Sequence, residues 1–467
     1  MAIDSPARRP VPAVSSLPGL SVGTEPICRD YARLDSLTWW RGRHITYGAF
    51  CAQVFALSLR LPSRGAVLNL CDDRAAFALA WAAALVRGVT TVLPSDRTRS
   101  AIVHAATERS ASCILLDHSP SEETRDVAPV LSVGYEADDI STPGGLPAIP
   151  ADQVAAILYT SGSTGKSLAS VKRWGQLVSG ALALGSMIGW THRQSRCVIG
   201  AIAPQHMFGL ETTVMLPFQW GAAIRPERPL LPADLSDVLA CATHPAWLMM
   251  TPLHAAAYLA SEPQSSSARP QGSISSTIPL PPVTAAALEK AWNAPVWEIY
   301  GTTETGMIGL RRTATSTEWQ LAEDLQMKVS EDQAVIWGRA DMPQHVLNDR
   351  LQPIAKDRFA LLGRNSDLVK VGGKRASLAD LNALLAGVKG VRDSIVVLPE
   401  EGGRLVALVV AEDGLTAREI RSQLARHIDP VFLPRPLWLV DRLPRNDNGK
   451  LPRNDLLEFI ARLRARM

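Results

Sequence analysis

The hydrophobic positions in the first third of the chain alternate between helical spacing and short continuous apolar runs. Helical spacing extends over residues 47–61 and again over residues 74–87. Short apolar runs at residues 66–70 and 90–93 have the length of buried strands, and the alternation continues beyond residue 110. Strands that alternate with helices predict a parallel sheet covered by helices.

Segments rich in polar residues, Gly or Pro interrupt this pattern and predict loops. Residues 1–25 are rich in Pro and Ser, which predicts a loose N-terminal arm. Residues 137–153 predict a connecting loop, and residues 155–159 predict the strand that follows it. Residues 262–276 are rich in Ser, Gln and Pro and predict a mobile surface loop.

Length and charge indicate more than one folding unit. The chain has 467 residues, 46% of them hydrophobic and 20% charged. Residues 364–467 contain 18 Lys and Arg against 13 Asp and Glu, a net charge of +5, whereas the whole chain carries +3. The other residues therefore carry −2, and this step predicts a separate, basic C-terminal domain that begins near Gly363.

Several classes of protein are excluded by composition. A net charge of +3 provides no strong nucleic-acid footprint, so no nucleic-acid partner is expected. The six cysteines stand far apart without a Cys-x-x-Cys pair, which argues against a disulfide framework or a zinc site and fits a reducing compartment. The longest uncharged apolar run, residues 75–86, is too short to span a bilayer, and no targeting segment is visible. We therefore expect a cytoplasmic protein with no membrane span.

A loop of small polar residues directly follows the strand predicted at residues 155–159. Glycines allow a phosphate to approach the backbone, and N–H groups, hydroxyls and a lysine can donate hydrogen bonds to its oxygens. The candidate residues are Thr160, Ser161, Gly162, Ser163, Thr164, Gly165 and Lys166. A flexible Gly/Ser turn is an equally good interpretation of this loop by itself. A Walker-type loop is excluded because it requires glycine at the position of Thr160.

Residues 159–166 resemble the nucleotide loop of the adenylate-forming superfamily, which includes acyl- and aryl-CoA synthetases, peptide-synthetase adenylation domains and luciferases. Three further blocks occur in the order and at the spacing of this superfamily. The second block is Tyr300, Gly301, Thr302, Thr303 and Glu304. The resemblance implies that this block covers the adenine and the α-phosphate, with Thr303 and Glu304 in catalytic positions. A carboxylate suits Mg²⁺, so Glu304 is the expected metal ligand, although a helix cap is the alternative for an isolated Thr–Glu pair.

The third block lies at the predicted domain boundary. Asp349 and Arg364, fifteen residues apart, match the pair that serves the ribose hydroxyls in the superfamily, whereas two lone charges would form a solvated pair. Asp367 matches the hinge about which the small domain rotates. The residues expected to line the pantetheine tunnel in the thioester-forming arrangement are Lys370, Gly372 and Gly373.

The fourth block, residues 443–453, contains Lys450, which the resemblance makes the catalytic cation, although a loop lysine is usually only solvated. The chain also departs from the superfamily pattern. Ser167, Leu168 and Ala169 stand where Pro-Lys-Gly is usual, so one phosphate-binding charge is either lost or supplied by Lys172 nearby.

The resemblance covers about residues 40–460 and implies an α/β fold. We expect a large N-terminal domain of helix-covered sheets (1–362), a hinge (363–367) and a small, mobile α+β C-terminal domain (368–467). The implied enzyme is an ATP- and Mg²⁺-dependent acid–thiol ligase that forms an acyl-adenylate and pyrophosphate. It then transfers the acyl group to a pantetheine thiol of CoA or of an acyl carrier protein. A degenerate member that binds nucleotide without turnover is the alternative.

His206 matches the superfamily position that borders the acyl pocket, although a lone His is more often a core group. Further pocket candidates are Phe208, Trp247, Gly306 and Met307, while a Trp/Met cluster is more often plain core. Peptide-synthetase domains carry an Asp near His206 that pairs the substrate amino group, and its absence here argues against an amino-acid substrate. An aryl acid or a short to medium acyl chain is expected, and the short chain resembles stand-alone ligases of aryl-polyene pigment clusters.

Overall fold

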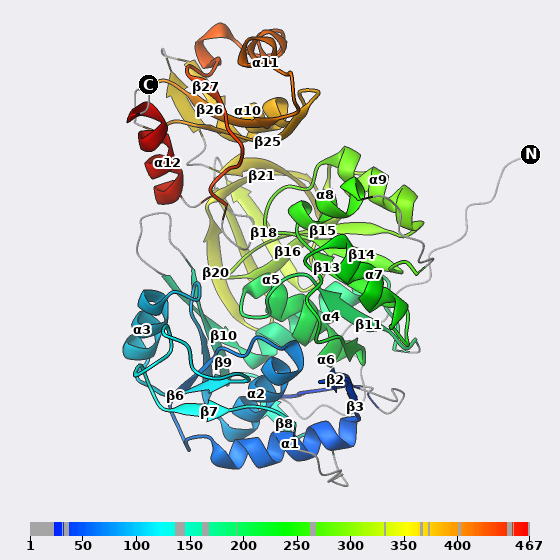
Figure 1. Cartoon of the computed structure of the whole chain (residues 1–467). Helices are drawn as coiled ribbons and strands as arrows, with labels where there is room; N and C mark the ends of the chain where they lie inside the picture. The colour runs from blue at the N-terminus through cyan, green and yellow to red at the C-terminus, as the bar shows by residue number, and fades with distance from the viewer. Residues whose placement is uncertain are drawn as a thin grey trace, which may run out of the picture.

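The computed structural model describes residues 23–29, 31, 37–135, 145–160, 168–192, 194–261, 268–330, 333–364, 368–371, 374–399, 403–445, 451 and 453–465. In these ranges the chain forms a large body and a smaller body, which lies above it in Figure 1. The architecture is mixed α/β, as the sequence predicts. No helix among the described residues is long and apolar enough to cross a membrane.

The first sheet confirms the parallel arrangement predicted from the alternating pattern. Its strand order is β10-β9-β5-β4-β6-β7, and all neighbours are parallel except the antiparallel edge pair β9 and β10. The strands are β4 (Ala66–Asn69), β5 (Thr90–Leu93), β6 (Ala111–Leu116), β7 (Val130–Ser132), β9 (Val154–Thr160) and β10 (Leu168–Arg173). The connecting helices are α2 (Arg74–Arg87), which follows β4, and α3 (Arg99–Glu108), which follows β5, while α1 (Tyr47–Arg60) precedes β4.

Local capping fixes the limits of α2. The Asp73 side chain accepts hydrogen bonds from the N–H groups of Ala75 and Ala76, and Gly88 ends the helix with φ of 74°. Nearly every side chain between these caps is buried, since α2 packs inside the large body. The uncharged run at residues 75–86 is therefore a core helix.

The second sheet has eleven strands in the order β21-β22-β17-β16-β15-β14-β13-β11-β12-β2-β3. Its parallel centre contains β2 (Thr38–Trp40), β11 (Cys197–Gly200), β12 (Ala223–Ile224), β13 (Ala246–Met250), β14 (Gly272–Ser275) and β15 (Val296–Thr302). Antiparallel strands complete both sides: β3 (Arg43–Ile45), β16 (Gly306–Arg311), β17 (Trp319–Leu321), β21 (Asp349–Ala355) and β22 (Arg358–Arg364).

The prediction of a surface loop over residues 262–276 is wrong for its last part. Gly272–Ser275 is the fully buried strand β14 and pairs with a strand on each side. Glycine is required at its start because a Cβ on Gly272 would lie 2.7 Å from the Trp247 ring. Small polar residues are thus selected here by packing, and this hides the strand from a hydrophobicity pattern. Residues 262–267 lie outside the described ranges.

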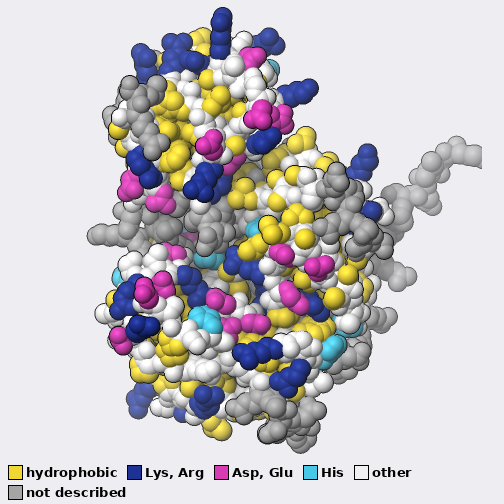
Figure 2. Space-filling view, in the orientation of Figure 1, with side chains coloured by type: hydrophobic (Ala, Val, Ile, Leu, Met, Phe, Trp, Pro, Cys, Tyr) yellow, Lys and Arg dark blue, Asp and Glu magenta, His cyan; other side chains and the backbone are white. Residues whose placement is uncertain are grey.

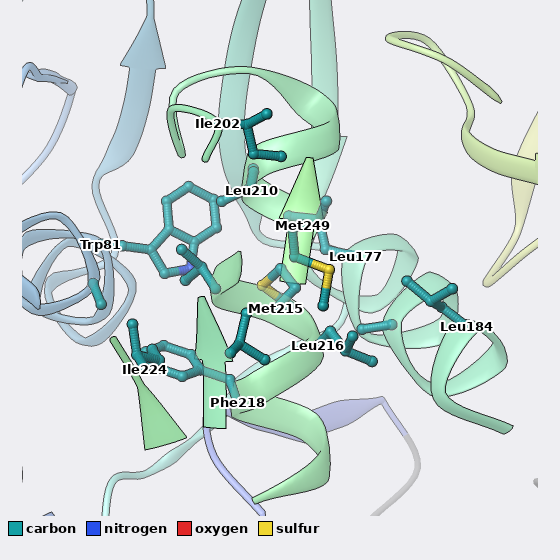
Figure 3. Packing of buried hydrophobic residues seen from close by; sticks show 14 of the residues in the cluster. Trp81, Leu177, Leu184, Ile202, Leu210, Met215, Leu216, Phe218, Ile224 and Met249 are labelled. Atoms are coloured by element: carbon teal, nitrogen blue, oxygen red, sulfur yellow. The ribbon is translucent and has the colours of Figure 1, made fainter. Parts of the chain in front are cut away.

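Helices fill the space between the sheets. Figure 3 shows Trp81 of α2 facing Leu210, Met215 and Phe218, with Leu177 and Leu184 of α4 on the other side. The helices that pack here with α2 are α4 (Trp174–Met187), α5 (Met207–Leu210), the π-helical turn η3 (Glu211–Met215) and α6 (Leu216–Trp220). Helices α7 (Pro232–Ala240), α8 (Pro252–Ala260) and α9 (Pro282–Trp292) alternate with the strands of the second sheet.

Two small sheets complete the large body. They are the pair β1 (Thr24–Pro26) and β8 (Ala148–Pro150), and the meander β18 (Leu325–Ser330), β19 (Gln333–Gly338) and β20 (Met342–Leu347).

The smaller body has its own hydrophobic clusters. The buried core of the large body ends at Phe359, and the clusters of the small body begin at Val369. Its strands are β23 (Leu368–Val371), β24 (Lys374–Ser377), β25 (Val391–Val397), β26 (Val406–Ala411) and β27 (Leu437–Leu439). Its helices are α10 (Leu378–Ala386), α11 (Ala417–Leu424), the 3₁₀ turn η5 (Pro430–Phe432) and α12 (Arg453–Ala465).

Candidate functional site

The block Tyr300–Glu304 forms the end of a central strand and a tight turn. Strand β15 ends at Thr302, and β16 returns from Gly306 as its antiparallel partner. Gly306 has φ of +72°, and a Cβ on Gly301 would lie 2.4 Å from the carbonyl oxygen of Gly306. The hairpin therefore requires both glycines, and Thr303 and Glu304 lie in its turn. The alternative of a helix cap is wrong.

The phosphate-loop candidates begin at an edge of the first sheet. Thr160 ends β9 and pairs with Leu168, which begins β10, so the two ends of the intervening loop lie side by side. Ser170, further along β10, donates a hydrogen bond from Oγ to the carbonyl oxygen of Thr303 at 3.3 Å. The structure thus brings the return strand of the loop against the turn of the second block. Ser161, Gly162, Ser163, Thr164, Gly165 and Lys166 lie outside the described residues.

The second and third blocks meet through a short hydrogen bond. The Tyr300 hydroxyl donates to Oδ2 of Asp349 at 2.7 Å, and the Tyr300 ring packs near Trp319 and Phe359. Asp349 and Arg364 are also backbone partners in the antiparallel pair β21 and β22. Two residues that are fifteen positions apart in the sequence thus lie opposite each other on adjacent strands. The side chain of Arg364 is outside the described part of the structure.

The His206 segment lies against the same hairpin. His206 precedes α5, and Gln205 beside it donates to the Cys71 carbonyl oxygen at 2.5 Å. A Cβ on Gly306 would lie 3.2 Å from Cε of Met207. Phe208 is half-buried on α5, and Met307 is fully buried at the start of β16. The contact between Met207 and Gly306 joins α5 to the hairpin. Four predicted pocket residues lie at or next to these two positions in the sequence: His206, Phe208, Gly306 and Met307.

Trp247 lies elsewhere. It is the second residue of β13, and its ring packs edge-on against Trp190 with centroids 5.4 Å apart and over Gly272. The other candidates sit at the opposite, C-terminal end of the parallel strands. The structure therefore favours the alternative of a core role for Trp247.

A cluster of buried charges that the sequence did not reveal lies behind the hairpin. Glu211 is 3% exposed and accepts hydrogen bonds from the Met307 N–H at 3.2 and 3.1 Å. Arg339 is 3% exposed, forms two hydrogen bonds with Asp324 at 2.7 and 2.9 Å, and donates to the Thr305 carbonyl oxygen at 2.9 Å. Burial raises the pKa of the Glu211 carboxyl. A signal for this cluster existed in the sequence only as isolated charges in apolar surroundings.

Lys172 belongs to this cluster. It is 3% exposed, and its ammonium donates to the carbonyl oxygen of Glu304. Burial lowers its pKa to about 8, while the carboxylates of Glu211 and Glu304 act in the opposite direction. In this structure Lys172 therefore contacts the turn, whereas the sequence offered it as a replacement charge for the phosphates.

The carboxylate of Glu304 suits a metal ion that is also bound by phosphates. Among the described residues there is no group of three or more His, Cys, Asp or Glu that could enclose a metal. Glu304 is an exposed carboxylate on the turn. Mg²⁺ is usually held by one or two carboxylates together with substrate phosphates, and a lone carboxylate fits that mode.

Several predicted residues of the third and fourth blocks fall outside the described ranges. Asp367, Gly372, Gly373 and Lys450 lie outside the described residues, and so does the side chain of Lys370. Among the described residues, the candidate site is therefore formed by the β15–β16 hairpin, the paired strands β9 and β10, the backbone pair Asp349–Arg364 and the start of α5.

Two family models match the chain. One describes an AMP-binding enzyme and matches residues 28–335, and the other describes an AMP-binding enzyme C-terminal domain and matches residues 380–450. The chain belongs to the AMP-binding enzyme family. The resemblance to the adenylate-forming superfamily is thereby confirmed, and so is the expected fold of a large N-terminal and a small C-terminal domain.

Relatives of this AMP-binding chain include ligases with two kinds of acceptor in their names. It is 32% identical to a 4-coumarate–CoA ligase of Rhodobacter capsulatus over 301 residues, which are 63% of this chain and 74% of the relative. It is 24% identical to an L-proline–[L-prolyl-carrier protein] ligase of Streptomyces coelicolor over 506 aligned positions, which cover 87% of this chain and 90% of the relative. The fold is similar to that of ATP-bound MatB from Rhodopseudomonas palustris, with a TM-score of 0.80, 20% identity and coverage of 93% and 98% of the two chains. At the level of the family, an AMP-forming adenylating ligase is supported.

Proposed function

We propose that this protein is an acid–thiol ligase that activates a small carboxylic acid with ATP and then forms a thioester. In the first step a carboxylate oxygen attacks the α-phosphorus of ATP, and the bond to the β-phosphate oxygen breaks. The products are an acyl-adenylate and pyrophosphate. In the second step a thiol, which gives up its proton, attacks the acyl carbon, and AMP leaves with the bonding electron pair.

The observation that carries this proposal is that the second block contacts both the third block and the strand that follows the first. Tyr300 donates to Asp349, and Ser170 donates to the carbonyl oxygen of Thr303. The hairpin of the second block therefore contacts both Asp349, which we propose for the ribose, and strand β10, which follows the loop that we propose for the outer phosphates. Positioning and charge neutralisation are the main tasks of a phosphoryl-transfer site, and this arrangement provides positions for both.

Each part of the nucleotide has proposed partners. Asp349 and Arg364 bind the ribose hydroxyls, and the loop from Thr160 to Lys166 binds the β- and γ-phosphates. Glu304 holds Mg²⁺, which neutralises phosphate charge when bound. Lys450 neutralises charge between the acid and the α-phosphate.

A two-position cycle follows from the domain organisation that we propose. The large domain comprises residues 1–362, the hinge 363–367 and the small domain 368–467. The separate hydrophobic clusters, which end at Phe359 and begin again at Val369, support this division. Rotation about Asp367 would withdraw Lys450 after the first step and bring in Lys370, Gly372 and Gly373 to line the path of the thiol.

The proposed substrate is an aryl acid or a short to medium acyl chain. Its pocket includes His206, Phe208, Gly306 and Met307, at the contact of α5 with the hairpin. The name of the Rhodobacter relative, a CoA ligase of an aryl acid, supports this class. Trp247 is left out of the pocket because it packs in the core.

The acceptor is a pantetheine thiol, and we propose an acyl carrier protein ahead of free CoA. Carrier proteins are typically acidic, and the C-terminal domain carries a net +5. Figure 2 shows many Lys and Arg side chains on the small body. The Streptomyces relative is named for a carrier-protein acceptor, which supports the same choice.

A nucleotide-binding protein without turnover is the second candidate. Leu168 is 57% exposed where related loops carry a lysine, so one phosphate contact is missing. The two candidates are separated by pyrophosphate release over a panel of aryl and fatty acids. Release that depends on one class of acid supports the ligase and identifies its substrate. Binding of ATP without release for every acid supports the non-catalytic alternative.

A further inference from the structure

Each carbonyl oxygen of the turn at residues 303–305 accepts a hydrogen bond from a side chain of a distant segment. Ser170 donates to the carbonyl oxygen of Thr303, Lys172 to that of Glu304, and Arg339 to that of Thr305. Carbonyl groups of exposed turns usually bind water. Three consecutive bonds to side chains of distant segments mean that the shape of this turn is imposed by its surroundings.

Two of these donors come from the strand that follows the phosphate loop. Ser170 and Lys172 are two positions apart on β10 and therefore lie on one face of the strand. They are 8% and 3% exposed, while Arg173, the next residue, is exposed. One strand thus links the loop at residues 160–167 to the turn of Glu304.

The choice of lysine at this buried position needs a reason other than stability. Burial of an ammonium group costs free energy, and an apolar side chain of similar size usually packs at least as well. The charges of the buried Lys172, Arg339 and Glu211 and of the half-buried Asp324 balance when all four groups are ionised. The cluster therefore tolerates a lysine at this position. Among the described residues, the Lys172 ammonium is the donor that binds the Glu304 carbonyl oxygen.

We propose that Lys172, assisted by Ser170 and Arg339, is a positioning residue that holds Thr303 and Glu304 in the arrangement required for Mg·ATP. This inference rests on the proposed function, because it takes Glu304 as the side chain that meets the metal. Groups that orient a metal ligand without touching the metal typically contribute 10–100-fold to affinity. We expect loss of the Lys172 bond to weaken Mg·ATP binding by ~10-fold or more, with a smaller effect on the KM of the acid.

The test separates positioning from stability by means of charge balance. Lys172→Met keeps the length of the side chain but removes both the charge and the donor. The double variant Lys172→Met/Glu211→Gln restores the charge balance and keeps an oxygen for the Met307 N–H, but it does not restore the bond to Glu304. Arg173→Met is the matched control, since it removes one positive charge from the next, exposed position of β10.

Binding of Mg·ATP is measured by titration calorimetry and stability by thermal unfolding, on the full chain. We expect Lys172→Met to lose both affinity and stability, and the double variant to recover stability without recovering affinity. Arg173→Met should keep the Mg·ATP affinity within about twofold of the wild type and leave the unfolding temperature nearly unchanged, because exposed charges contribute little.

Two results would overturn the inference. One is wild-type affinity in Lys172→Met, and the other is recovery of affinity together with stability in the double variant, which would make Lys172 a purely structural residue. Acid-dependent pyrophosphate release by the wild type is measured in parallel. Its absence together with normal Mg·ATP binding refutes the ligase but leaves the inference standing, while a wild type that binds no Mg·ATP refutes both.

Discussion

Replacement of Tyr300 by Phe isolates the contact between the second and third blocks. The change removes one oxygen, which donates to Oδ2 of Asp349 at 2.7 Å. The ring should stay in place, because it packs near Trp319 and Phe359 and the residue is only 9% exposed. The variant therefore leaves the strand and the hairpin intact and takes from Asp349 one donor that orients it.

The magnitude follows from the type of bond. A hydrogen bond to a charged group contributes ~1.5–3 kcal/mol, and a half-buried carboxylate favours the lower end. About 1.4 kcal/mol corresponds to a factor of ten in an equilibrium constant. We therefore expect the KM for ATP to rise ~10-fold in Tyr300→Phe, while kcat for pyrophosphate release changes less.

The assay includes a substrate that reports on the ribose. If Tyr300 orients Asp349 toward the ribose hydroxyls, the variant should also discriminate less between ATP and 2′-deoxy- or 3′-deoxy-ATP. Tyr258→Phe is the matched control, since Tyr258 is also 9% exposed and donates to the Pro229 carbonyl oxygen at 2.9 Å, in a bond that involves no proposed site residue. Its KM for ATP should stay unchanged. Unchanged KM and unchanged discrimination in Tyr300→Phe would refute the argument that this bond prepares the ribose site.

Three further predictions concern the two half-reactions and the acceptor. Lys450→Ala should abolish formation of the acyl-adenylate but largely spare thioester formation from supplied acyl-adenylate, and an equal loss in both half-reactions would contradict its role. Gly372→Trp should leave pyrophosphate exchange intact and block transfer to the thiol, because a bulky side chain has no room beside a narrow tunnel; a normal yield of thioester would show that this loop does not line it. Charge reversal at Arg375 and Arg392 should slow loading of a carrier protein more than transfer to free CoA, with rates that fall as salt shortens the Debye length well below ~10 Å. Fast turnover with CoA and none with any carrier from the same source would contradict the proposed acceptor.

Long-range packing explains where sequence reasoning failed. Residues 272–275 appear polar, yet Gly272, Ser273 and Ser275 form a buried strand because the Trp247 ring leaves room only for a small residue at its start. Trp247 appears suitable for an acyl pocket, but its position on β13 places it at the wrong end of the parallel strands. In both cases the neighbour that decides the role of a residue is remote in the chain.

The sequence alone determined the features that depend on short-range patterns. The alternation of helices and strands over residues 47–116 is local, since it follows from side-chain periodicity and from caps such as Asp73 and Gly88. The four blocks are likewise short sequence motifs, and their residues and spacing were sufficient to identify the family.

Only the tertiary structure decided how these blocks cooperate. Lys172 and Glu304 are separated by 132 residues, and Tyr300 and Asp349 by 49, so no local pattern connects the partners of these bonds. Burial converts Lys172 from a candidate phosphate ligand into a partner of the turn, because an ammonium group removed from water must bind whatever acceptor the fold supplies. Lys172 meets Glu304 because the two large sheets pack together, whereas Tyr300 meets Asp349 within the second sheet, and neither arrangement can be read from the order of the residues.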